Sequence, residues 1–160
     1  MRRIAAIGLA ILAWAPTARG TADPDVAKEL RAALSEWTHG SKTAPYADAL
    51  AAHCRSRREC LSLLAIAYWE SGFSDFVLDF RCNDSAWRAK QKSEWLREKA
   101  CDSGESVGPW QIHDLAFVGS SPDKQATKAV ELFRDSPARW TVWRRGWAQQ
   151  QVTAWMGAHP

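Results

Sequence analysis

A segment that is apolar on almost every side places the strongest constraint on the fold of this chain. Residues 58–70 have large apolar side chains at helical spacing, and from Leu63 to Trp69 only the Tyr68 hydroxyl and the Trp69 indole N–H are polar. A helix of this kind is stable only when other elements cover it on nearly all sides. The sequence therefore predicts a helical domain with residues 58–70 at its centre.

Glu70 ends this apolar run and is the candidate catalytic residue. A carboxyl group among large apolar side chains is poorly hydrated, which disfavours its charged form and raises its pKa. A carboxylic acid that stays protonated near neutral pH can act as a general acid. A lone Glu at the end of a helix can also be a capping residue or the partner of an arginine. The catalytic interpretation therefore depends on a second segment.

The first 20 residues have the pattern of a secretory signal peptide. Two arginines near the start precede an apolar stretch over residues 4–15, and small residues surround the expected cut after Gly20, with a cut after Ala22 as the alternative. The apolar stretch is too short to span a bilayer, so we expect no stable membrane insertion after cleavage. We expect one mature domain, residues 21–160, in the periplasm or outside the cell.

The basic character of the chain comes from this signal. Residues 1–20 contain three of the 21 Lys and Arg residues and none of the 18 Asp and Glu residues, so the rest of the chain carries 18 of each. A net charge of zero gives no support for binding to an anionic polymer through charge alone. We therefore expect no nucleic-acid partner.

Four cysteines, an even number, follow the expected signal peptide. In an exported chain this predicts disulfides, and three pairings are possible. We favour Cys54–Cys60 and Cys82–Cys101, because each pair joins neighbours in the sequence. A zinc site is the alternative, but the spacings differ from those of known zinc sites. We expect neither a metal nor a cofactor.

Most of the remaining chain is predicted to be helical. Three helix starts show a capping residue followed by proline, at Asp23, Ser121 and Ser136. The tryptophans at 140, 143 and 147 have the spacing of core residues on one helix. The expected helices cover residues 24 to about 40, 45–53, 58–70, 86–100, 122–134 and 137–155.

Residues 102–113 interrupt this pattern. Gly104, Gly108 and Pro109 make a helix improbable there, and Val107 and residues 110–112 resemble strand pieces around tight turns. Residues 76–78 fit either a short strand or one turn of helix. The expected fold class is α+β: mostly helical, with one small antiparallel β ribbon.

Two segments resemble soluble lytic transglycosylases and goose-type lysozymes, which belong to the lysozyme-like superfamily. Glu70-Ser71-Gly72-Phe73 is similar to the Glu-Ser segment that ends their catalytic helix. Residues 108–112 look like their Gly-Leu-Met-Gln-Ile/Val segment, with Pro109 and Trp110 in place of Leu-Met. The stretch that begins Asp102-x-Gly104 resembles the Asp-x-Gly that precedes this segment in the goose type.

The resemblance implies a lysozyme-like fold with a groove between a helical body and a small sheet. Glu70 would protonate the glycosidic oxygen of peptidoglycan. In the transglycosylase version Glu70 then acts as a base toward a hydroxyl of the same sugar, which gives a 1,6-anhydro product and consumes no water. In the hydrolase version a second carboxylate positions water, and Asp102 is the candidate for that role.

The resemblance also implies four substrate-binding residues. Ser71 would help to orient Glu70, and Gln111 would orient Glu70 or a sugar amide. Trp110 would offer an indole face on which a sugar stacks. His113 falls where goose-type enzymes often carry another Asp. The plain alternatives are a helix-end residue for Ser71, a strand-pairing side chain for Gln111 and a turn residue for Asp102.

The leading hypothesis is a monomeric, exported enzyme that cuts the β-1,4 bond between N-acetylmuramic acid and N-acetylglucosamine, with transglycosylase favoured over hydrolase. Its partners would be the glycan strands of peptidoglycan and, by analogy with the family, a cell-envelope assembly. One alternative is a non-catalytic domain that binds the wall or a partner. A second is a disulfide-linked helical protein unrelated to sugars. The second alternative predicts no binding to sacculi at all. Separation of Glu70 and Gln111 on opposite faces would leave the lysozyme-like interpretation without support.

Overall fold

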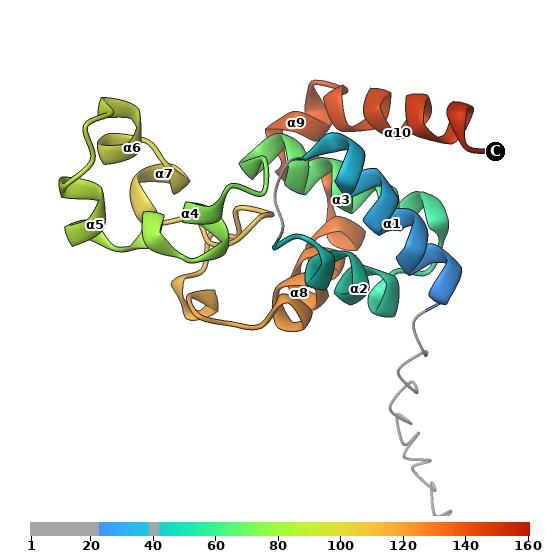
Figure 1. Ribbon diagram of the computed structural model, residues 1–160, viewed down its shortest axis with the longest axis horizontal. Coiled ribbons are helices and arrows are strands. Elements are labelled where there is room, and N and C mark those ends of the chain that lie inside the picture. The colour runs from blue at the N-terminus through green and yellow to red at the C-terminus, as the bar shows by residue number, and fades with distance from the viewer. Residues whose placement is uncertain (1–22, 39–41) are drawn as a thin grey trace, which may run out of the picture.

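The computed structural model describes residues 23–38 and 42–160 (Figure 1). The expected signal peptide, both of its possible cleavage positions and Gly40 lie outside the described residues. The described chain is mostly helical, as the sequence predicts. None of its helices in these ranges is both long and apolar enough to cross a membrane.

The helices and helical turns follow one another in the order shown in Figure 1. The α-helical elements are α1 Pro24–Trp37, α2 Ala44–His53, α3 Arg57–Ser71, α4 Asp75–Leu78, α5 Ser85–Ala89, α6 Glu94–Glu98, α7 Cys101–Gly104, α8 Pro122–Asp135, α9 Thr141–Arg144 and α10 Trp147–Ala158. The 3-10 turns are η1 Arg81–Asn83, η2 Leu115–Phe117 and η3 Pro137–Arg139.

Helix α3 lies at the centre of the molecule, as its apolar sequence predicts. All of its side chains from Cys60 to Ala67 are buried, and α1, α2, α8, α9 and α10 contact it. The Ser56 side chain caps its first turn, and Gly72 ends it in a left-handed conformation, with φ of 58°. Burying one leucine side chain of this helix stabilises the fold by about 1.5–3 kcal/mol. We call α1, α2, α3, α8, α9 and α10 the helical body.

Residues 74–106 form a separate projection at one end of the molecule, which we call the small lobe (Figure 1). It contains α4 to α7 and has its own small cluster of buried residues, formed by Val77, Cys82, Ala100 and Cys101. Hydrogen bonds from one side chain close the lobe, because the Asn83 amide donates to the carbonyls of residues 104 and 106 at 2.9 and 2.8 Å. The lobe is therefore held by few apolar contacts, and hydrogen bonds from side chains to the backbone add to them.

Both predicted disulfides are present. Cys54–Cys60 joins the end of α2 to α3, with 5.5 Å between the Cα atoms. Cys82–Cys101 joins η1 to α7 inside the small lobe, with 5.9 Å between the Cα atoms. The predicted caps at Asp23 and Ser121 also form, whereas the Ser136 side chain makes no capping hydrogen bond.

The single helix predicted over residues 86–100 is wrong, because the chain forms α5 and α6 with a bend between them. The Ser93 hydroxyl accepts a hydrogen bond from the N–H of Leu96 and so starts a new helix. The Arg97 guanidinium donates to the carbonyls of Gln91 and Lys92 at 3.0 and 2.9 Å. These side chains form the hydrogen bonds that the backbone groups of the bend would otherwise form within a continuous helix.

The last predicted helix, 137–155, is also interrupted. Gly146 has φ of 80°, which ends α9 and gives α10 a new start at Trp147. The break changes the direction of the following side chains, so the core spacing of the three tryptophans holds only in part. Trp140 is buried, Trp143 is half-buried against Phe133, and Trp147 is 38 % exposed.

The predicted β ribbon is not confirmed. Among the described residues, its place is taken by an isolated antiparallel bridge between Val107 and Ile112, with both hydrogen bonds at 2.9 Å. Gly108 and Gln111 both have positive φ, which turns the chain back within four residues and leaves no length for a strand. Residues 76–78, for which strand and helix were both open, belong to the helical turn α4.

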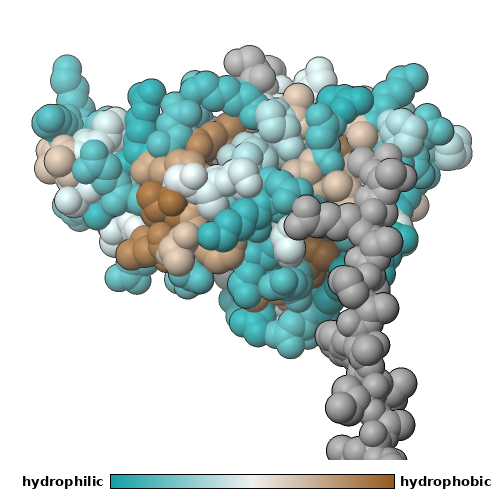
Figure 2. Space-filling view, turned by 90° about the horizontal axis from the view of Figure 1, so that it is seen from below, coloured by the Kyte–Doolittle hydropathy of each residue, from teal (hydrophilic) through white to brown (hydrophobic). Residues whose placement is uncertain are grey.

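Large apolar side chains are also exposed. Figure 2 shows apolar surface, in brown, gathered on the face of the molecule that is seen from below. Two of the exposed side chains, Leu115 and Val118, lie in or next to η2. The other three are tryptophans, at 69, 95 and 147. Single exposed apolar side chains are common on protein surfaces, so exposure alone assigns no function to any of them.

Candidate active site

A pocket of about 680 Å³ opens beside the C-terminal end of α3. Glu70 lies on its wall together with Asp102 and Gln111. The other lining residues come from the turn 110–114, from α8 and from residues 139–141. Glu70 and Gln111 therefore share one pocket, as the resemblance requires, and are not on opposite faces.

A second pocket of about 270 Å³ lies on the other side of Glu70, toward the small lobe. The two pockets share Glu70, Asp102 and Gln111, and the smaller one adds Ser71, Trp95 and Lys99 among others. Glu70 thus stands where two hollows meet. A ligand that fills both pockets would border Glu70, Asp102 and Gln111.

The pKa of Glu70 is raised above the ordinary value of 4.5. Burial at the end of α3 is the main cause, because it removes water from the charged form. The negative charge of Asp102 raises the pKa further. A hydrogen bond from the Val142 backbone N–H and the positive charges of His113 and Arg144 oppose the rise without cancelling it. The shift favours the protonated form of the carboxyl group, which is the form that donates a proton.

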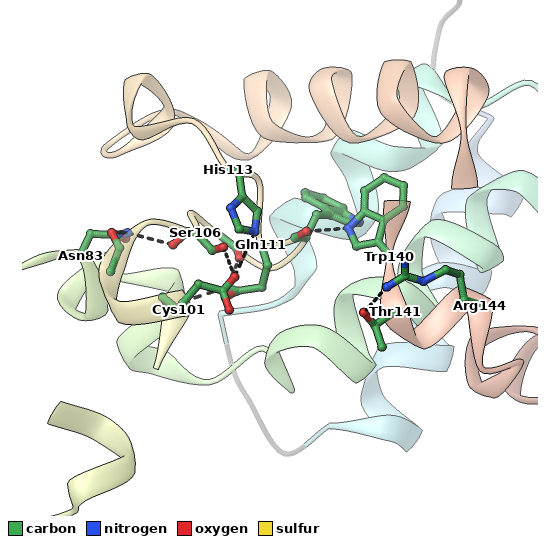
Figure 3. A network of polar contacts seen from close by, with 12 residues as sticks. Asn83, Cys101, Ser106, Gln111, His113, Trp140, Thr141 and Arg144 are labelled. Carbon is green, nitrogen blue, oxygen red and sulfur yellow. Dashed lines mark hydrogen bonds and ion pairs between the residues drawn. The ribbon is translucent and has the colours of Figure 1, made fainter. Parts of the chain in front are cut away.

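Asp102 is held by two side chains, although it is exposed. The Ser106 hydroxyl donates to its carboxylate, and the His113 Nε2 lies 3.0 Å from the same oxygen. Figure 3 shows the imidazole and the hydroxyl pointing to this one carboxylate. Asp102 also sits in a run of left-handed backbone, since residues 101–103 have φ of 51°, 48° and 62°. Such a backbone costs about 1–2 kcal/mol per residue, and strain of this kind gathers at functional sites.

The turn that carries Gln111 is fixed against α8 by a close approach. Gly108 has φ of 67°, and a Cβ at this position would overlap the Oε1 of the fully buried Gln125. Only glycine fits such a position. The Gln111 side-chain amide donates to the Gly108 carbonyl at 2.9 Å, so its orientation follows from the turn. Gln111 borders the pocket, and its predicted role of orienting Glu70 or a sugar amide stays a prediction.

Trp110 does not have the surface that its predicted role needs. It borders the larger pocket, but its side chain is 0 % exposed, so a sugar cannot stack on the indole. The indole N–H donates to the Leu63 carbonyl of α3 at 2.9 Å, and the Trp110 carbonyl accepts from the Trp140 indole at 2.8 Å (Figure 3). The residue anchors the floor of the pocket to the central helix.

Ser71 has the plain role of a helix-end residue. Its hydroxyl donates to the Ala67 carbonyl at 2.8 Å and accepts from the Phe73 N–H at 3.1 Å. These bonds close the end of α3 and so fix the position of the preceding residue, Glu70. Ser71 also borders the smaller pocket.

Sequence reasoning missed several residues of the two pockets. Lys128 and Arg139 bring positive charge to the larger one, next to Thr141, whose hydroxyl accepts from Arg144 at 2.9 Å (Figure 3). The extended backbone of Trp140 ends η3 and starts α9 at Thr141, and the continuous helix predicted over residues 137–155 hid this break. Trp95 was missed for a similar reason, since the bend before it was read as continuous helix.

Comparisons with protein-family models, with curated proteins and with solved structures found no match to this chain. The geometry of the pockets and the two short segments are therefore the features that bear on the function of this chain.

Proposed function

We propose that this chain is a peptidoglycan-cleaving glycosidase of the lytic transglycosylase type, in which Glu70 is both the acid and the base. The observation that carries the proposal is the raised pKa of one half-buried carboxyl group at the meeting point of two pockets. A raised pKa favours the protonated form that a general acid needs, and the pockets give a substrate access to the carboxyl group. The likeness of the segments at Glu70 and Gln111 to the lysozyme-like superfamily supports the choice of substrate.

The reaction needs one proton carrier. The Glu70 carboxyl group donates its proton to the oxygen of the β-1,4 bond, and the bond from this oxygen to the anomeric carbon breaks. The N-acetyl group of the substrate stabilises the positive charge that develops at the anomeric carbon. The Glu70 carboxylate then accepts the proton of the 6-hydroxyl as that oxygen attacks the same carbon. The product is a 1,6-anhydro sugar, and Glu70 is protonated again.

Asp102 has an electrostatic part in this scheme. Its charge raises the pKa of Glu70, which favours the acid form before the first step. The two carboxyl groups border both pockets. Because Ser106 and His113 hold the Asp102 carboxylate, its charge stays in one place while Glu70 gains and loses its proton.

Hydrolysis is the second candidate, and the same held carboxylate favours it. A glycosidase that uses water needs a second carboxylate to activate or position it. The Asp102 carboxylate borders the larger pocket with an orientation fixed by Ser106 and His113, which suits that role. The product would then carry a reducing end.

Digestion of purified sacculi tests the proposal. We expect Glu70→Gln to lower the release of soluble fragments by about 10²- to 10⁴-fold, the usual contribution of a general acid. Asp102→Asn should retain most activity if the enzyme is a transglycosylase and lose it if the enzyme is a hydrolase. Mass spectrometry separates the products, because anhydro ends indicate the first and reducing ends the second.

Three outcomes would contradict the leading proposal. Equal activity of the wild type and Glu70→Gln would remove the role given to Glu70. Binding of sacculi without release of fragments would favour a non-catalytic wall-binding domain. Reducing ends alone would favour the hydrolase.

The place of action that we propose is the periplasm or the outside of the cell, where peptidoglycan is accessible. The two disulfides support this, because such bonds persist in oxidising compartments. A cell-envelope assembly that needs a local opening in the wall is the partner class that we propose by analogy.

A further inference from the structure

Trp95 occupies an unusual place for an indole. It belongs to α6 in the small lobe, is 56 % exposed, and borders the same pocket as Glu70. No hydrogen bond of its indole N–H is found within the described residues, so this donor is open to a ligand. An exposed aromatic face with a free donor at its edge is well suited to a sugar, which has an apolar face and hydroxyl groups around it.

Contacts within the small lobe fix the position of Trp95. Its ring meets Phe76 edge-on, with 6.4 Å between the ring centroids, and Phe76 stacks on Trp87 at 6.0 Å. The N–H groups of residues 99 and 100 both donate to the Trp95 carbonyl at 2.9 Å. Trp95 therefore presents a preorganised face to the pocket, and ordering it on binding costs little.

Lys99 adds a charge to the same pocket. It borders the pocket with Trp95 and Glu70, and it makes no ion pair among the described residues. The cations of the larger pocket differ in this respect, since Lys128 pairs with Glu131 at 3.3 Å and Arg139 pairs with Asp135. Lys99 is thus the cation of this groove that has no acidic partner within the described chain.

We propose that Trp95 and Lys99 form a sugar-binding subsite on the small-lobe side of Glu70, specific for an amino sugar that carries a carboxylate. The subsite rests on the proposed function, because it extends the same groove. The indole stacks on the sugar ring, and the ammonium of Lys99 pairs with the carboxylate of its lactyl or peptide substituent. A strand held in both pockets passes Glu70 in its middle, so the bond that is cut lies inside the strand.

Binding of two soluble tetrasaccharides by the full mature chain tests the subsite. One is a peptidoglycan fragment with its peptide carboxylates, and the other is chitotetraose, which is neutral. We expect Trp95→Ala to weaken the binding of both by about tenfold, and Trp95→Phe to weaken it less, because a smaller aromatic face remains. The Lys99→Gln variant should weaken only the carboxylate-bearing fragment, by about two- to fivefold and less at high salt.

Trp147→Ala is the matched control. Trp147 is another exposed indole, but it borders neither pocket, so its removal should leave both affinities unchanged. The Trp95→Phe variant covers the case in which Trp95→Ala disturbs the lobe, because an affinity lost equally in both variants would contradict stacking on an aromatic face.

The failures of the two proposals are distinguishable. If the wild type digests sacculi but Trp95→Ala binds both fragments as the wild type does, the subsite is overturned and the proposed function stands. If Lys99→Gln weakens both fragments equally, the specificity for a carboxylate is overturned. If the wild type neither digests sacculi nor binds either fragment, the proposed function fails and the subsite with it.

Discussion

The helical body and the small lobe are held together by different physical means. The body buries a large continuous apolar core around α3, whereas the buried cluster of the lobe has four residues, two of which form a disulfide. The lobe compensates with hydrogen bonds from side chains to its backbone, from Asn83, Arg97 and Ser103 among others. Packing holds the first region, and covalent and polar contacts hold the second.

The body and the lobe contribute different residues to the candidate site. Glu70 belongs to the body, and its raised pKa depends on burial that the core enforces. Asp102 and Trp95 belong to the lobe, and their positions depend on the disulfide and on short side-chain contacts. We therefore expect the proton chemistry to be robust and the grip on substrate to be easily disturbed.

The largest expected effect is on the body. Leu64 is fully buried in α3, so Leu64→Ala leaves a cavity in the core. We expect the free energy of unfolding to fall by about 2–5 kcal/mol, measured by urea denaturation. The exposed Val118 is the control. Val118→Ala should change the free energy of unfolding by less than about 0.5 kcal/mol. A loss below 1 kcal/mol for Leu64→Ala would contradict the view that packing around α3 holds the body.

A smaller and more local effect is expected from the lobe. Replacing both Cys82 and Cys101 by serine opens a loop with a sequence separation of 19. The entropy of such a loop corresponds to roughly 3 kcal/mol. Because few apolar contacts join the lobe, we expect amide hydrogen exchange to accelerate over residues 81–106 and to stay slow in α3. Equal acceleration in both regions would show that the two are one cooperative unit.

The smallest expected effect is the pH dependence that each carboxyl group contributes. A pKa raised in the folded state means that Glu70 stabilises the fold fully below about pH 4.5 and loses this contribution as pH rises through its folded pKa. Glu70→Gln should therefore gain stability relative to the wild type as pH rises from 4 toward 7. Thermal unfolding at several pH values measures the difference.

Glu29 in α1 provides a control of opposite sign. The Arg57 guanidinium, hydrogen-bonded to its carboxylate, lowers the pKa of Glu29. Its stabilising contribution is present above the ordinary pKa of 4.5 and is lost as pH falls through the lower folded value. Glu29→Gln should thus lose stability relative to the wild type as pH rises toward 4.5, below the interval in which Glu70→Gln gains it. The same sign for both variants would contradict the assigned environments.

Local signals made much of the body predictable. The apolar run of α3, the caps at Asp23 and Ser121, and the short spacing of the cysteines each act within a few residues of the chain. The breaks at Gly146 and before Ser93 were missed, because a helical pattern of side chains continues across both. At the first break the left-handed Gly146 ends the helix, and at the second the Ser93 side chain caps a new one, although the pattern of side chains predicts a continuous helix.

The site was predictable to a smaller extent. The raised pKa of Glu70 could be expected from its apolar setting, and the pocket that Glu70 shares with Gln111 was expected from the resemblance alone. That Trp110 points inward could not be seen, because its indole is held by the Leu63 carbonyl, 47 positions earlier. The exposed face of Trp95 depends on the bend between α5 and α6. It could not be predicted, because the helical pattern of side chains continues across that bend.

The pairing of the cysteines has a consequence for how the chain matures. Each cysteine bonds to the next one along the chain, at separations of 6 and 19 residues, so neither bond encloses or crosses the other. In a chain made from its N-terminus, the next thiol to appear after Cys54 or Cys82 is its correct partner, and short loops close within about a microsecond. We therefore expect fewer wrongly paired intermediates during oxidation than in a chain whose disulfides interleave.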